Sequence, residues 1–174
     1  ELAPESAHIL FRRELQLSGL AGGITGEHGF NQGDAYEPKL AGAIIIGGIL
    51  CYNQFPSRGG NLDHTVVAVD LHTGETLWNH GLITPEGDNL RLSFGQVFYW
   101  DSYNYHGVFG YIWATQGSDW YAFDPMSGRF EYSMDGVPSG VTVYGPKGEI
   151  FRYYMNKNQG IVRLWNSSRV VSNA

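Results

Sequence analysis

One short pattern, A-x-D-x-x-[TS]-G-x-x-x-[WY], occurs twice in the chain, 54 residues apart. The first copy consists of Ala68, Asp70, Thr73, Gly74 and Trp78, and the second of Ala122, Asp124, Ser127, Gly128 and Tyr132. Each copy joins a stretch of strand-forming residues to a second strand that carries a large aromatic residue. Two matching copies predict a duplicated strand–turn–strand unit, which is typical of repeat architectures.

Each position of the pattern has a physical reason. Asp70 ends its strand, and its carboxylate is placed to accept hydrogen bonds from amides of the turn. Gly74 is expected in the left-handed conformation that closes such a turn, where a side chain would be strained. Trp78 has the apolar area needed at a seam between packed sheets. We therefore interpret Asp70 and Asp124 as turn caps rather than as catalytic acids.

The motif resembles the blade repeat of the quinoprotein-type, or PQQ-like, β-propellers, in which the Trp docks one blade onto the next. The closest likeness is to secreted archaeal PQQ-like domain proteins, and it extends to Tyr111–Trp113, Gly148–Ile150 and Leu164–Ser168. The resemblance covers roughly residues 41–165. It implies an all-β fold, a β-propeller of four-stranded antiparallel blades, and says little about activity because this fold has many functions.

A blade takes about 40 to 50 residues and a ring about four to eight blades, so 174 residues are too few for most rings. We interpret the chain as a single partial ring or a segment of a longer propeller. The alternative is that its open edges pair with another chain. The expected parts are an end strand of a preceding blade at 1–16, blades at 39–82 and 90–134, and an incomplete blade at 137–174.

The strand expected within 1–16 places Phe11 at the position of Trp78. It either ends a preceding blade or closes the ring beside the C-terminus. Gly47-Gly48 predicts a hairpin between two apolar runs, each expected to be buried on both faces. Leu82–Leu90 and Asp101–Gly110 are expected to be loops, and Leu92, Phe94, Gln96, Phe98 and Trp100 to share one strand face. In the last blade, Arg163 and Trp165 align with Ala122 and Asp124 after a shift of 41 residues.

Composition excludes several functional classes. The chain has 24 Gly, 14% aromatic and only 16% charged residues, which favours strands over long amphipathic helices. Its net charge of -6, with no basic cluster larger than Arg12-Arg13, argues against a nucleic-acid partner. No run approaches the roughly 20 apolar residues of a membrane span. A start at Glu1 without Met is interpreted as a processed or truncated end.

Cys51 is the one cysteine of the chain and lies in an apolar run, so we expect it to be a small buried hydrophobic residue. The quinoprotein alcohol dehydrogenases of the resembling family carry an adjacent cysteine pair near the quinone, and this chain lacks it. Asn166-Ser167-Ser168 is a sequon for N-glycosylation, which together with the resemblance predicts an extracellular or cell-surface location.

The sequence contains no catalytic motif and predicts no catalytic residues. Its six histidines have no metal-binding spacing, so no metal site is predicted either. The candidate ligand surface is a loop whose polar and aromatic residues suit recognition of a glycan or a protein; it consists of Asp101, Tyr103, Asn104, Tyr105 and His106. The alternative is that these aromatic residues only cover a blade end.

We therefore expect a non-catalytic extracellular β-propeller that acts as a binding or structural scaffold module in a cell-surface or secreted assembly. Its expected partners are other protein chains or the remaining blades of the same polypeptide, with glycans as a further class. One alternative is a fragment of a PQQ-dependent dehydrogenase, which would use PQQ and Ca²⁺ as cofactors. The other is a carbohydrate-binding propeller. The enzyme question stays open, and the non-enzymatic interpretation is favoured.

Overall fold

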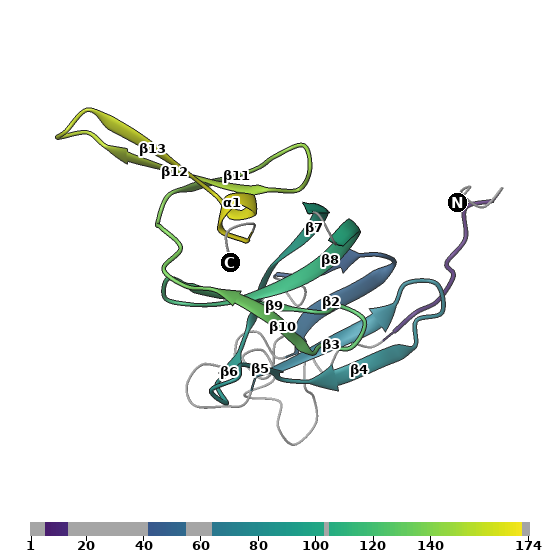
Figure 1. Ribbon diagram of the computed structural model, residues 1–174. Helices are drawn as coiled ribbons and strands as arrows, with labels where there is room; N and C mark the ends of the chain where they lie inside the picture. Colours follow the sequence, from purple (N-terminus) through teal and green to yellow (C-terminus); the bar gives the residue numbers. More distant parts are fainter. Residues whose placement is uncertain (1–5, 14–41, 55–63, 103–104, 172–174) are drawn as a thin grey trace, which may run out of the picture.

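A computed structural model describes residues 6–13, 42–54, 64–102 and 105–171 of the chain (Figure 1). These residues form two four-stranded antiparallel sheets, a three-stranded antiparallel sheet and one two-stranded ladder. The described residues include a short helix, α1 (Ser167–Val171), which follows the last strand. The predicted all-β class is confirmed, and two of the sheets have four antiparallel strands.

Sheet 1 is an up-and-down meander whose strands follow chain order. The strands are β1 (Ile44–Ile46), β2 (Ile49–Gln54), β3 (Thr65–Asp70) and β4 (Thr76–His80). Gly47 and Gly48 have φ values of 58° and 79°, and they close the predicted β1–β2 hairpin in the conformation that favours glycine. The expectation of burial on both faces is wrong for β1, because it is an edge strand and Ile45 is 64% exposed.

Sheet 2 repeats this meander with longer first strands. Its strands are β7 (Leu92–Ser102), β8 (Tyr105–Gln116), β9 (Asp119–Phe123) and β10 (Phe130–Met134). The loop predicted at Asp101–Gly110 is therefore wrong: β7 and β8 stay paired as far as Ser102 and Tyr105. The reason is that Val108 and Phe109 are strand-forming residues, which extend the ladder past the polar side chains taken as turn signals.

One strand face also differs from expectation. Phe94 pairs with Trp113, but Leu92 pairs with Ala114, so the register shifts by one residue between them. Such a β-bulge moves the side chains that precede it to the other face. Phe94 and Phe98 therefore belong to one core, as expected, whereas Leu92 belongs to the core on the opposite face.

Sheet 3 has three strands, β11 (Val141–Tyr144), β12 (Ile150–Asn156) and β13 (Ile161–Asn166), and α1 follows directly. These strands match the incomplete last blade in position. The segment 82–90, predicted to be a loop, contains a small ladder of β5 (Leu82–Ile83) and β6 (Asn89–Leu90). The backbone N–H of Thr84 donates to the carbonyl oxygen of Asp88 at 2.9 Å, which closes this ladder.

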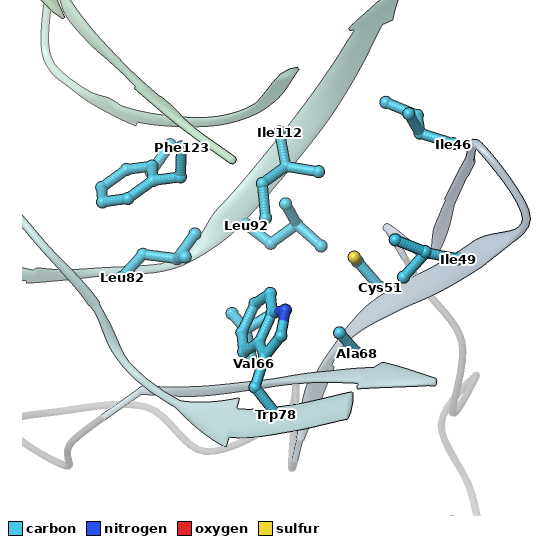
Figure 2. Close-up of a cluster of buried hydrophobic side chains, with 11 residues drawn as sticks. Ile46, Ile49, Cys51, Val66, Ala68, Trp78, Leu82, Leu92, Ile112 and Phe123 are labelled. Carbon is cyan, nitrogen blue, oxygen red and sulfur yellow. The ribbon is translucent and has the colours of Figure 1, made fainter. Parts of the chain in front are cut away.

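The three sheets stack face to face, with sheet 2 in the middle (Figure 1). Side chains alternate along a strand, so sheet 2 sends one set to each neighbour. Ile112 and Ala114 of β8 join the core shared with sheet 1, and Tyr111 and Trp113 join the core shared with sheet 3. Figure 2 shows the first core, where Val66 and Trp78 of sheet 1 lie in one cluster with Leu92, Ile112 and Phe123 of sheet 2.

Residues 6–13 form no strand, although a strand was predicted there. A β-strand needs a neighbour for its backbone hydrogen bonds, and no described segment pairs with these residues. The remaining residues of the predicted 1–16 strand lie outside the described part of the chain. The described sheets form neither a closed barrel nor a ring.

Candidate functional site

The two copies of the repeat motif fold into hairpins with the same register. The pairs in sheet 1 are Ala68 with Trp78 and Val69 with Thr76, and those in sheet 2 are Ala122 with Tyr132 and Phe123 with Phe130. Both hairpins have an irregular register at the same step, which leaves Leu77 and Glu131 as the extra residues. The sequence repeat is therefore also a repeat of backbone geometry, down to its bulge.

The two turns use their aspartates in the predicted way. Asp70 Oδ1 accepts hydrogen bonds from the backbone N–H of His72 at 2.7 Å and of Thr73 at 2.9 Å. Asp124 accepts from the Ser127 hydroxyl at 2.6 Å and from the backbone N–H of Met126 at 3.1 Å. The amide of Thr73, followed by that of His72, lowers the pKa of the Asp70 carboxyl. Both carboxylates are thus engaged by their own turns.

Trp78 joins sheet 1 to the turn of the second hairpin. It is buried, and its indole Nε1–H donates to the carbonyl oxygen of Pro125 at 2.9 Å. His80 lies beside it, with ring centroids 4.7 Å apart, and its Nε2 is 3.1 Å from the carbonyl oxygen of Ser127. A Cβ placed on Gly128 would lie 2.6 Å from the His80 ring and 3.1 Å from the Trp78 ring. Gly128 is therefore required by close packing as well as by its φ of 66°.

The N-terminal segment makes an equivalent contact with the first hairpin. A Cβ on Gly74 would lie 2.6 Å from the Phe11 ring, as one on Gly128 would from His80. Arg13 stands two residues after Phe11, as His80 stands two after Trp78, and its guanidinium donates to the carbonyl oxygen of Gly74 at 2.9 Å. Residues 6–13 thus occupy the place that β4 takes against sheet 2, although they form no strand.

Tyr132, the aromatic residue of the second copy, faces sheet 3. Its ring packs edge-on against Tyr111, Trp113 and Trp100. Burial, followed by the neighbouring Tyr111, raises the pKa of its phenol. It also lines a cavity of about 330 Å³ with Val171 of α1.

A buried polar side chain supports this second seam. Gln96 of β7 accepts a hydrogen bond from the Trp113 indole at 3.1 Å and donates one to the carbonyl oxygen of Gly148 at 2.6 Å. The backbone N–H of Tyr99 donates to the carbonyl oxygen of Lys147 at 2.9 Å. The turn between β11 and β12 is therefore fixed onto β7.

The expected alignment of the third repeat is displaced by one residue. Arg163 pairs with Tyr154, and Trp165 with Arg152, so these side chains share the face of sheet 3 that packs toward sheet 2. Ala122, with which Arg163 was aligned, points from sheet 2 toward the following sheet. A shift of the alignment by one residue places every side chain of a strand on the opposite face of the sheet. Alternation of side chains along the strand does not reveal such a shift.

The opposite face of sheet 3 is apolar and open. Directly paired residues of neighbouring strands share a face, which groups Val141 with Tyr153 and Leu164, and Met155 with Val162. Val141 is 68% and Leu164 56% exposed. We call this surface the onward face of sheet 3; its residues are Val141, Val143, Phe151, Tyr153, Met155, Val162 and Leu164, with Asn166 at its edge opposite Phe151. In Figure 1, β12 and β13 project from the body of the protein.

The predicted ligand surface is the end of the β7–β8 hairpin. Asp101 and His106 pair across the ladder, with His106 Nδ1 3.5 Å from the Asp101 carboxylate. The Lys147 ammonium, from the turn between β11 and β12, lies 3.9 Å from the same carboxylate. Tyr103 and Asn104 lie outside the described residues, and Tyr105 is placed only as a backbone position of β8. The groups that are described are exposed, so this surface has the features of a solvated charge cluster.

A cleft between sheets 2 and 3 was not predicted from the sequence. Two adjoining cavities of about 510 Å³ each share Arg152 of β12. Trp120 and Tyr144 line the first, and Trp165 and Arg163 line the second. No sequence signal identifies this cleft, because the walls of the first cavity come from both sheets and depend on how these stack, whereas the second is lined by sheet 3 and the residues before it.

Cys51 is buried in the core between sheets 1 and 2. It is 1% exposed, as predicted, and burial, with a smaller contribution from Asp124, raises the pKa of its thiol to about 12.

Asn166 ends β13. Its side-chain oxygen accepts hydrogen bonds from the backbone N–H of Ser168 at 3.0 Å and from the Ser168 hydroxyl at 2.8 Å. Asn166 therefore caps α1, and its glycosylation stays a prediction.

Among the described residues, no three or more His, Cys, Asp and Glu side chains gather in a group that could hold a metal ion. Within the same residues, no helix is long and apolar enough to cross a membrane. No family model matches the chain, and comparison with curated proteins finds no significant match.

Proposed function

We propose that the chain is a non-catalytic scaffold module of the β-propeller type, which belongs to an extracellular or cell-surface assembly. In this proposal its sheets are successive blades around an axis, and the onward face of sheet 3 docks a further β-sheet of the same repeat type. The proposed location is supported by the sequon at Asn166 and by the resemblance of the repeat to secreted propellers.

One observation carries the proposal: successive sheets use the same face to contact the next one. Sheet 1 turns Ala68 and Trp78 toward sheet 2, and sheet 2 turns Ala122 and Tyr132 toward sheet 3. The onward face of sheet 3 is the equivalent surface, and the described residues leave it open. Contiguous exposed apolar surfaces of this kind mark interaction sites in soluble proteins.

The chemistry of the onward face favours a β-sheet as its occupant. Apart from Asn166 at the edge, its side chains are aliphatic, aromatic or sulfur-containing, and none is charged. Within the molecule, similar side chains on sheets 1 and 2 are covered by a neighbouring sheet. A flat apolar surface across three strands is best covered by another flat surface, because sheets pack about 10 Å apart with interdigitating side chains.

The test measures self-association of the isolated chain. In such a solution other copies of the chain supply the available β-sheets, so the onward face is expected to drive reversible association seen by analytical ultracentrifugation. Leu164→Glu should weaken it, because the new carboxylate would lose its hydration in the interface. Val108→Glu is the matched control, since Val108 is 67% exposed on a strand of sheet 2, away from the onward face.

Two results would contradict the proposal. One is a wild-type chain that stays monomeric at every concentration reached. The other is equal weakening by both substitutions, which would show a general effect of added negative charge. Circular dichroism of both variants establishes that the strands are retained before the association data are compared.

A further inference from the structure

The cleft between sheets 2 and 3 contains a cation held in a fixed orientation. The Arg152 side chain donates from Nε to the carbonyl oxygen of Pro138 at 3.0 Å and from Nη1 to the Thr142 hydroxyl at 2.6 Å. Its guanidinium lies over the Trp120 ring, 5.5 Å from the centroid. These three contacts already restrict the rotamers of Arg152 before a ligand binds. Binding therefore costs little further side-chain entropy.

The positive charge of Arg152 is not neutralised by a described residue. Both of its hydrogen-bond acceptors are uncharged, and no described Asp or Glu lies within 4.0 Å of the guanidinium. Nη2 has no acceptor among these residues, so the end of the guanidinium keeps donors for a further partner. A planar group with two acceptor oxygens, such as a carboxylate, matches these donors.

Aromatic rings and hydroxyl groups surround this cation. Trp120 and Trp165 meet edge to face, with centroids 5.9 Å apart, and Trp165 lines the second cavity. Tyr144 and Tyr154 are partly exposed rings at the first and second cavity, respectively. Ser93 and Thr115 place hydroxyl groups 3.2 Å apart at the wall of the first cavity.

We propose that this cleft binds an acidic saccharide, a chain of sugar units that carry carboxylates. The carboxylate of one sugar unit binds Arg152. The apolar faces of the sugar rings pack on the aromatic side chains of the cleft, and the sugar hydroxyls form hydrogen bonds with Ser93 and Thr115. Two adjoining cavities of about 510 Å³ accommodate more than one unit, and Arg163 in the second meets the next carboxylate. The proposal goes beyond the scaffold function. Arg152, its central residue, lies on the face of sheet 3 that packs toward sheet 2, although the second cavity also reaches Leu164 of the onward face.

The chain's overall charge helps to distinguish this site from general ion attraction. A net charge of -6 repels anions from most of the surface, so an acidic saccharide is bound only where a local cation and a shaped cavity compensate. The proposed site differs from the candidate ligand surface at the end of the β7–β8 hairpin, which stays a prediction.

The test follows the indole N–H signals of Trp120 and Trp165 by NMR while a trigalacturonate is added, with neutral D-glucose oligomers of equal length as the second probe. The acidic trimer should shift both signals in a saturable way, and the neutral one should not. Arg152→Gln should weaken the affinity by about tenfold or more, the loss typical of one hydrogen bond between charged groups. Arg129→Gln, an equal change of charge at an exposed position outside the cleft, should leave the affinity unchanged.

Arg163→Gln is a second substitution in the cleft, which keeps the proposal testable if Arg152→Gln does not fold. The Arg163 side chain is exposed and makes no hydrogen bond with another described residue. Its substitution is therefore expected to leave the fold intact and to weaken binding by severalfold. The proposal is overturned if the acidic trimer shifts neither indole signal, or if the neutral oligomer binds as well. It is also overturned if Arg129→Gln weakens binding as much as the two substitutions in the cleft.

Discussion

At the scale of single residues, the repeat is explained by three groups with separate tasks. The aspartate satisfies amides that the turn leaves without backbone partners, and the glycine permits both a positive φ and close packing. The aromatic residue of the first copy, Trp78, covers the turn of the second copy at Gly128. Sequence reasoning predicted the turn hydrogen bonds of Asp70, the positive φ of Gly74 and a seam position for Trp78, because each follows from local chemistry. It did not identify His80, whose contact with the Ser127 carbonyl oxygen depends on the packing of two sheets.

Asp70 is expected to make stability depend on pH. Its pKa is lowered in the folded chain by the amides of Thr73 and His72, so folding favours its charged form. This contribution is fully present above the unfolded aspartate pKa of about 3.9 and is lost as the pH falls through the lower folded value. The carboxyl carbon signal of Asp70 in NMR should therefore titrate below 3.9, and a midpoint at or above that value would contradict the prediction.

Cys51 is expected to be chemically inert while the chain is folded. Burial withholds the thiol from solvent and raises its pKa to about 12, so almost no thiolate exists at pH 8. A disulfide reagent should leave the native chain unmodified for hours and react within minutes after addition of guanidinium chloride. Rapid reaction of the native chain would show that the core between sheets 1 and 2 is open at this point.

At the scale of elements, local patterns predicted hairpins well and strand ends poorly. The Gly47-Gly48 turn and both D-x-x-[TS]-G turns were found because a tight turn must be made by few residue types. The β7–β8 hairpin was cut short because its last residues are polar, although backbone pairing there needs no apolar side chain. α1 was missed because its five residues are too few for a periodic signal, and only Asn166 marks its start.

Gly128 is expected to be irreplaceable for two separable reasons. Gly128→Ala introduces a Cβ at positive φ and also 2.6 Å from the His80 ring. Gly117→Ala is the matched control, since Gly117 has a φ of 63° and nothing within 4 Å of the added Cβ. The control should lose about 1 kcal/mol of unfolding free energy, and Gly128→Ala about 1 to 3 kcal/mol more.

Urea denaturation of both glycine variants measures this difference. The excess loss in Gly128→Ala isolates the packing of sheet 1 on the second turn from the backbone strain that both variants share. Equal losses in the two variants would mean that no side chain of sheet 1 rests on the Gly128 turn.

At the scale of the whole molecule, the described residues form a stack of three larger sheets in which the middle one is covered on both faces. The sequence predicted blades at 39–82, 90–134 and 137–174, and the strands of sheets 1, 2 and 3 lie within these ranges. It could not predict which faces meet, because one bulge before Phe94 and one slip near Arg163 each reverse a face without changing the pattern of apolar residues. The Arg152 cleft depends on those faces and was invisible for the same reason.

The most direct test of this stack is a set of proton–proton contacts measured by NMR across its repeated seam. The account predicts nuclear Overhauser effects between the Trp78 indole and the α-protons of Gly128, and equivalent effects between the Phe11 ring and the α-protons of Gly74. Both pairs present would establish that one docking arrangement is used twice. A Trp78 ring that contacts only protons of sheet 1 would contradict the account.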